Sequence, residues 1–174
     1  MRDESLRPES DRLALVAPNA ESRSPWLAPP RSRNAKVMDK TFLIAHVIYR
    51  LDVGGLENGL VNLINRMPGD RYRHVIVCLT DYTDFRKRIQ KQVPVYAMAK
   101  REGKDLSLYL RLWGLFRSLQ PDIAHTRNLA TLEAQLPAFL AGVPHRVHGE
   151  HGRDVHDLDN TSRKYRLLRA AYRP

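Results

Sequence analysis

The sequence predicts an α/β protein built on a Rossmann-like, doubly wound parallel sheet. Short, nearly continuous apolar runs of strand length alternate with longer segments in which apolar residues recur at helical spacing. Continuous apolar runs are typical of parallel strands that are buried on both faces. A helix between successive strands supplies the right-handed crossover that such a sheet requires. Ligands of these sheets bind beyond the carboxyl ends of the strands, so functional residues are expected there.

Strands and helices are expected to alternate from Thr41 onward. The apolar runs predict strands over residues 42–49, 74–79, 93–98, 122–125 and 145–150. Helical spacing predicts helices over residues 56–67, 84–90, 106–119, 129–140 and 160–172. Pro68-Gly69 ends the first helix, and the third ends before Pro121. Pro137 is expected to kink the fourth helix, and Gly142 to cap it.

The chain is expected to contain a tail and one domain. Residues 1–39 are rich in Ser, Pro and Arg and show no sustained apolar period, which predicts a disordered tail. Residues 40–174 form the folded part, and an apolar content of 43% suffices for a core. The net charge of +10, from 29 basic and 19 acidic residues, favours anionic partners. Charges nearly cancel in the tail, so the excess belongs to the folded part.

Two features bear on compartment. No stretch approaches the roughly 20 apolar residues that a membrane span needs, and residues 13–17 are too few for a signal peptide core. The single cysteine, Cys78, lies inside an apolar strand, where it is expected to be a small buried hydrophobe. A cytoplasmic location is therefore expected, with contact at a membrane surface left open.

The first candidate loop follows the first strand and contains Gly54, Gly55 and Glu57. Adjacent glycines let the backbone turn tightly and let a ligand approach closely. The free N–H groups of the following helix attract phosphate, and Glu57 in its first turn can help to cap it. A plain strand-to-helix turn is the alternative interpretation. Neither the dinucleotide-binding glycine pattern nor a P-loop is present.

The second candidate loop follows the fourth strand and contains His125, Arg127 and Asn128. His125 is placed at the strand end. The guanidinium of Arg127 is suited to pair with an anionic group of an acceptor. Helix capping by Asn128 or Thr131 is the alternative.

The third candidate loop carries an unusual density of histidine and charge, over residues 148–157. A hydrogen-bonding pocket for sugar hydroxyls is favoured, because a neutral imidazole both donates and accepts. A metal site is disfavoured, since the His-Glu-x-x-His helical spacing is absent. His145 and His148 fit a structural role within the strand.

Three segments at these loops resemble the amino-terminal domain of family-4 retaining glycosyltransferases. They are Tyr49-Arg-Leu-Asp-Val-Gly-Gly-Leu-Glu57, Pro121-Asp-Ile-Ala-His-Thr-Arg-Asn128 and Val147-His-Gly-Glu-His-Gly-Arg-Asp154. More narrowly, the chain resembles the sugar transferases associated with exosortase-type (PEP-CTERM) exopolysaccharide loci. The likeness covers residues 42–174.

The resemblance implies the amino-terminal half of a GT-B fold, in which two Rossmann-like domains face each other across a cleft. It implies hexosyl transfer from a nucleotide-sugar to a saccharide or lipid-linked acceptor, with retention of configuration, no metal and no cofactor. By resemblance, Gly54, Gly55 and Glu57 form the loop toward the donor diphosphate, and His151 is the catalytic residue facing the transferred sugar. The residues expected to bind acceptor or sugar are His125, Arg127, Asn128, Glu150, Arg153 and Asp154.

The chain also departs from the family pattern. The family's carboxyl-terminal donor domain, with its Glu-x₇-Glu motif, is not found in the 174 residues. These residues alone are therefore expected to be inactive and to require that domain as a partner.

Basic clusters suggest contact with anionic lipid at the inner face of a bacterial membrane, although solvated helix faces are an equal alternative. They comprise Arg86, Lys87, Arg88, Lys91, Arg163, Lys164, Arg166 and Arg169.

Another GT-B enzyme, such as an epimerase, is one alternative function. A nucleic-acid-binding module is another, but few aromatic residues are available for stacking, so nucleic acid is not expected as a partner.

Overall fold

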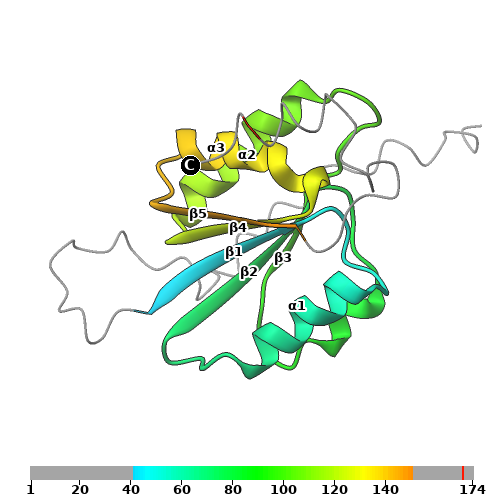
Figure 1. Cartoon of the computed structure of the whole chain (residues 1–174), viewed down its shortest axis with the longest axis vertical. Coiled ribbons are helices and arrows are strands. Elements are labelled where there is room, and N and C mark those ends of the chain that lie inside the picture. The colour runs from blue at the N-terminus through cyan, green and yellow to red at the C-terminus, as the bar shows by residue number, and fades with distance from the viewer. Residues whose placement is uncertain (1–40, 151–169, 171–174) are drawn as a thin grey trace, which may run out of the picture. The chain divides into compact units, whose positions relative to one another are not determined.

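The computed structural model describes residues 41–150 and Ala170 (Figure 1). The predicted tail over residues 1–39 lies outside the described residues, as does the predicted helix over residues 160–172 apart from Ala170. Within the described ranges, no helix is both long enough and apolar enough to cross a lipid bilayer.

The described part of the chain is built on a five-stranded sheet with the order β3-β2-β1-β4-β5. The strands are β1 (Phe42–Ile48), β2 (Tyr72–Cys78), β3 (Val95–Ala97), β4 (Ile123–Arg127) and β5 (His145–Gly149). All four strand pairings are parallel. The predicted α/β, Rossmann-like parallel sheet is therefore confirmed.

The strand order reverses between β1 and β4. The chain runs outward from β1 through β2 to β3 and then returns to add β4 on the other side of β1. The segments that follow β1 and β4 consequently leave the sheet in opposite directions. Such a reversal point is where ligands of open parallel sheets bind.

Helices cover both faces of the sheet (Figure 1). The helix α1 (Gly55–Arg66) lies on one face, and α2 (Leu106–Leu119) and α3 (Gln135–Leu140) lie on the other. The predicted helix over residues 84–90 is a 3₁₀ helix, η3 (Asp84–Arg88). The helix expected over residues 129–140 is instead two pieces, the 3₁₀ helix η4 (Leu129–Ala134) and then α3.

The sequence suggested that Pro137 kinks a long helix, but the structure shows no such kink at this residue. It lies in the first turn of α3, where its missing N–H group would have had no partner inside the helix. Gly142 follows α3 with a φ of 79°, a left-handed conformation that suits glycine after a helix.

The core consists of two clusters, one on each face of the sheet. Toward α2 and α3, Val47, Val75 and Val77 pack with Leu108, Leu112 and Phe116. Toward α1, side chains of β1 and β2 pack with the buried side of that helix: Ile48, Ile76, Cys78, Leu60, Val61 and Ile64. Cys78 is buried as predicted, and burial raises the pKa of its thiol to about 12.

The amino terminus of α2 is fixed by Asp105. Its carboxylate accepts hydrogen bonds from the Ser107 hydroxyl at 2.6 Å and the Leu108 N–H at 3.2 Å, and it pairs with Arg111 at 2.8 Å. These contacts, with the Ser107 hydroxyl foremost, lower the pKa of Asp105. An aspartate at this position typically stabilises a helix by about 1 kcal/mol.

Candidate functional site

The predicted loops begin along one edge of the sheet, and the third is described only as far as Glu150. Val47 of β1 is paired with Thr126 of β4, and Arg127 of β4 with Gly149 of β5, so the carboxyl ends of these three strands are neighbours. The Asn128 N–H also donates to the Gly149 carbonyl at 2.9 Å. The structure thus places the glycine loop, the segment after β4 and the end of β5 in sequence around the reversal point.

The two glycines of the first loop do not serve a tight turn. Gly54 precedes α1 with φ −167° and ψ 163°, an extended conformation that any residue adopts, and Gly55 is the first residue of the helix. A Cβ atom added to Gly55 would meet nothing within 4 Å. Glycine at this position therefore leaves open space in front of α1, which suits close approach of a ligand.

Glu57 does not cap α1 as expected. No side chain makes a capping hydrogen bond at this helix start. The Glu57 carboxylate instead lies against Gly54, where it occupies the space that a Cβ atom on that residue would need. The first N–H groups of α1 therefore lack the side-chain acceptor that many helices have.

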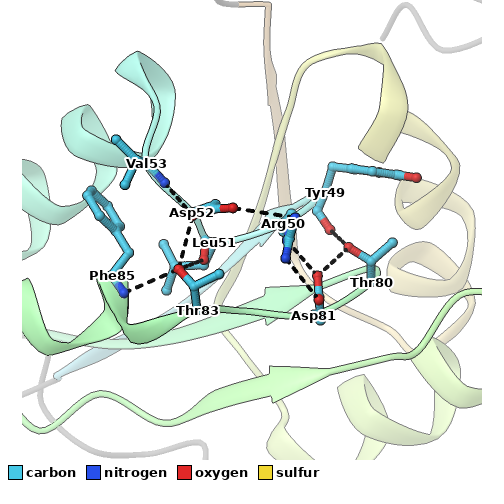
Figure 2. A network of polar contacts seen from close by, with 9 residues as sticks. All are labelled: Tyr49, Arg50, Leu51, Asp52, Val53, Thr80, Asp81, Thr83 and Phe85. Carbon is cyan, nitrogen blue, oxygen red and sulfur yellow. Dashed lines mark hydrogen bonds and ion pairs between the residues drawn. The ribbon is translucent and has the colours of Figure 1, made fainter.

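A polar network holds the base of this loop against the segment after β2, and Figure 2 shows its members. The Arg50 guanidinium lies 2.8 Å from Asp81 and 3.4 Å from Asp52. The Thr80 hydroxyl donates to the Tyr49 carbonyl at 2.9 Å. The Arg50 and Asp81 side chains are 47% and 60% exposed, so their ion pair orients the loop more than it stabilises the fold.

Asp52 fixes the turn immediately before the glycines. Its carboxylate accepts from the Val53 N–H at 2.8 Å and from the Thr83 hydroxyl at 3.1 Å (Figure 2). These hydrogen bonds, with the Val53 N–H foremost, lower the pKa of Asp52. Asp52 and Thr83 are 31 residues apart, so local sequence pattern does not predict their contact. An aspartate two residues before a glycine pair is the one local signal that points to such a turn.

The second loop begins later than predicted. β4 continues to Arg127, so His125 lies inside the strand and Arg127 is its last residue. Arg127 is only 6% exposed, and burial lowers the pKa of its guanidinium. Its Nε atom has no hydrogen-bond partner among the described residues. Arg127, which was predicted to pair with an anionic group of the acceptor, thus lies at the end of β4 and not in the loop that follows it.

The turn after β4 holds Asn128 in an unusual conformation. Its φ of 61° and ψ of 160° fall in a region that residues other than glycine rarely adopt. Thr131 closes this turn: its hydroxyl accepts from the Arg127 N–H at 2.8 Å and donates to the Arg127 carbonyl at 2.7 Å. Asn128 makes no side-chain cap hydrogen bond to η4, and Thr131 lies inside η4 with its hydroxyl bonded to Arg127, so neither residue caps this helix.

Three histidines line the α1 side of the strands behind this edge. His46 of β1 lies 3.1 Å from His74 of β2, ring nitrogen to ring nitrogen, and its ring centroid lies 5.8 Å from that of His125. Burial first, and then the charges of His74, Arg127 and His125, lower the pKa of His46 well below its usual value. Burial and nearby Lys91 lower the pKa of His74 to about 4. The imidazoles of His46 and His74 are therefore neutral at physiological pH.

The end of β5 is fastened to β4 from the opposite face. His148 Nδ1 lies 2.8 Å from the Thr126 hydroxyl, and the Gln135 amide donates to that hydroxyl at 2.6 Å. Burial lowers the pKa of His148, against the opposing effect of Glu150. His148 therefore has the structural role that the sequence suggested, whereas His145 is exposed.

Comparison with known proteins identifies the chain at the family level. The family model described as Glycosyltransferase Family 4 matches residues 53–174, which is more than half of the 174 residues. The chain belongs to glycosyltransferase family 4. No curated protein and no solved structure matches it. Family-4 membership supports a glycosyltransferase-like function, and the parallel sheet with flanking helices is consistent with it.

The match spans all the candidate residues of this family-4 domain. It includes Gly54, Gly55 and Glu57 at the start of α1, His125, Arg127 and Asn128 at the end of β4, and Glu150 after β5. The predicted catalytic His151 and the predicted sugar-binding Arg153 and Asp154 lie inside the matched range but outside the described residues. Their roles, and the choice between a sugar pocket and a metal site in that segment, remain predictions.

The basic cluster near η3 of this family-4 domain is largely engaged in contacts within the protein. Lys91 donates to the Ile64 carbonyl at 2.7 Å and also to the Met67 carbonyl, so it caps the end of α1. Lys87 pairs with Asp84 at 2.7 Å, and Arg88 stacks on Phe85. The second predicted cluster, over residues 163–169, lies outside the described residues.

Proposed function

We propose that this domain is the acceptor-side half of a GT-B glycosyltransferase that transfers a hexosyl group from a nucleotide-sugar to a saccharide or lipid-linked acceptor. Transfer proceeds with retention of configuration and without a metal, in exopolysaccharide or other cell-envelope biosynthesis. The observation that carries the proposal is the family-4 match, which spans the glycine loop, the end of β4 and the end of β5 at the carboxyl edge of the sheet.

The open start of α1 supports a place for the donor diphosphate. Positive partial charge gathers at a helix amino terminus, and the uncapped N–H groups of α1 are suited to phosphate oxygens. Gly55 leaves room for the phosphate to approach the backbone. The polar network around Asp52 and Arg50 keeps this loop in place before a ligand binds, which lowers the entropic cost of binding.

The edge near β4 and β5 supports a place for the acceptor. Arg127 brings a buried positive charge to this edge, and Asn128 projects from a backbone that is held in a rare conformation. His151 is the proposed catalytic residue facing the transferred sugar. A second domain of the GT-B type would hold most of the nucleotide-sugar, as in the family to which the chain belongs.

The test is to assay sugar transfer by the 174-residue chain alone and joined to the donor-binding domain of a family-4 glycosyltransferase. Candidate nucleotide-sugars and a bacterial lipid extract serve as substrates. We expect transfer from the joined protein and little from the chain alone. Absence of both nucleotide-sugar binding and transfer by the joined, folded protein would contradict the proposal.

A matched pair of glycine substitutions tests the role of the loop. Gly55→Ala and Gly59→Ala each add one methyl group to α1, and neither added Cβ meets an atom within 4 Å. Only Gly55 lies at the loop, so Gly55→Ala is expected to lower kcat/KM by about tenfold or more through lost phosphate contacts. Gly59→Ala is expected to retain the activity. Equal activities of the two variants would remove the loop from the donor site.

A further inference from the structure

The outer surface of α2 and α3 is unusually apolar. Six of the ten large hydrophobic side chains that are exposed in the described part of the chain lie on these two helices. They include Leu106 at 78%, Leu110 at 71%, Leu140 at 61% and Phe139 at 58% exposure. We call these six residues the α2–α3 face: Leu106, Leu110, Trp113, Leu136, Phe139 and Leu140.

The helical spacing makes this face continuous along each helix. Leu106, Leu110 and Trp113 are separated by four and three residues and therefore form one stripe along α2. The Tyr109 hydroxyl reaches Glu133 at 3.4 Å, so the adjacent side of α2 is turned toward η4 and α3. The core positions of α2, among them Leu112 and Phe116, lie on the opposite side against the sheet.

Basic residues border the α2–α3 face. Arg101 and Lys104 are exposed before α2, and Arg117 is exposed in its last turn. Arg146 is exposed beside α3 and lies 4.9 Å from the ring centroid of Phe139. Glu102 is exposed near the first pair, whereas Glu133 is ion-paired with Lys100. The border is therefore mainly positive, in a chain with a net charge of +10.

We infer that the α2–α3 face binds the anionic surface of a lipid bilayer, with its apolar side chains inserted among the headgroups and its basic residues against them. Apolar burial and attraction between basic residues and anionic lipid together account for this kind of reversible binding. A second copy of the chain fits less well, because two-fold pairing through this face would bring two positive borders together.

Membrane binding through the α2–α3 face would bring the candidate site close to a lipid-linked acceptor. This part of the inference rests on the proposed function. The Met98 N–H bonds to Cys78, the last residue of β2, and α2 starts at Leu106, so α2 begins near the carboxyl edge of the sheet. A protein bound through the α2–α3 face would hold that edge near the membrane surface. A lipid-linked acceptor could then reach the candidate site without leaving the bilayer.

The test is co-sedimentation of the full 174-residue chain with vesicles. Binding is expected to vesicles that contain phosphatidylglycerol and to be much weaker with phosphatidylcholine alone. Leu110→Glu is expected to lower the partition coefficient by about tenfold, because it places a charge at the centre of the inserted stripe. Leu63→Glu on α1 is the matched control: it alters net charge equally at an exposed leucine on the other face of the sheet, and it is expected to bind like the unmodified chain.

Fluorescence separates insertion of this face from binding by another part of the chain. The chain has two tryptophans, so Trp26→Phe leaves Trp113 as the sole reporter. Its emission is expected to shift to shorter wavelength on anionic vesicles and to be quenched by brominated lipid.

Three results would overturn the inference: no binding to anionic vesicles, equal losses in Leu110→Glu and Leu63→Glu, or vesicle binding that leaves Trp113 emission unchanged. A concentration-dependent dimer that Leu110→Glu abolishes would assign the face to a second copy instead. None of these measurements involves sugar transfer, so failure here and failure of the proposed function are distinguishable.

Discussion

The two faces of the sheet differ in what their strands contribute. Toward α2 and α3, the strand side chains near the centre of the sheet are Ala45, Val47, Val75, Val77 and Ala124. Toward α1, the same strands present His46, His74 and His125, and β4 ends at the buried Arg127. Both faces therefore contribute a core cluster to stability, but the α1 face also carries three histidines and Arg127, polar groups that are costly to bury, next to the candidate site.

Truncating a core side chain between the sheet and α2 should cause the largest loss of stability. Phe116 is 1% exposed within the cluster of α2 and the sheet, so Phe116→Ala is expected to lower the free energy of unfolding by about 3–5 kcal/mol. Urea denaturation followed by circular dichroism measures this value. Leu110→Ala, at an exposed position of the same helix, is the control and should change it by less than about 0.5 kcal/mol. Similar losses in both would place Phe116 outside the core.

The histidine face should make stability depend on pH. The folded-state pKa values of His46 and His74 lie below the unfolded value of about 6.5, that of His74 near 4. Only the unfolded chain gains these protons as the pH falls from about 6.5 to 4, so the free energy of unfolding is expected to fall by about 2 kcal/mol over that range. Above pH 6.5 this contribution is fully present. Denaturation midpoints measured across this range test the expectation.

A paired variant isolates the histidines from the carboxylates that titrate at lower pH. His46→Gln with His74→Asn retains amide groups at the positions of the two facing ring nitrogens, which are 3.1 Å apart. The double variant should lose most of the slope between pH 6.5 and 4. An unchanged slope would mean that other groups cause it. Arg127, His125 and Lys91 are the charged or titratable neighbours that act on the pair.

The α2–α3 side also has buried polar side chains, among them Gln135 at the ends of β4 and β5. The Gln135 amide donates to Thr126 at 2.6 Å and to the Val147 carbonyl at 3.0 Å. Gln135→Leu removes both donors, and we expect a loss of about 1–2 kcal/mol in the free energy of unfolding. Gln135→Glu keeps the shape but also lacks the donors, so rescue by this variant would show that the hydrogen bonds are unimportant.

The smallest expected effect lies at the edge between the two faces. Asn128 has φ 61° and ψ 160°, and Asn128→Gly is expected to stabilise the domain by up to about 1 kcal/mol by relieving this strain. If Asn128 binds the acceptor, the same variant should raise KM in the joined protein. Greater stability with unchanged KM would leave Asn128 with a structural role only.

The sequence predicts the sheet more completely than the site. Each apolar run became a strand, because a continuous apolar run has few other places in a parallel α/β protein. The helix expected over residues 129–140 is divided because Pro137 starts a new helix more readily than it continues one. The contacts between Arg50 and Asp81 and between His46 and His74 join residues 31 and 28 positions apart. Such partners follow from strand order, which local pattern does not encode.

The burial of Cys78 makes it possible to measure how often the sheet opens. Cys78 is the chain's only cysteine, is fully buried in β2 and has a thiol pKa of about 12, so a thiol-modifying reagent cannot react with it while β2 is in place. The rate of labelling in native buffer therefore reports how often β2 separates from α1. Slower labelling in the presence of a nucleotide-sugar would show that a bound ligand makes this opening rarer.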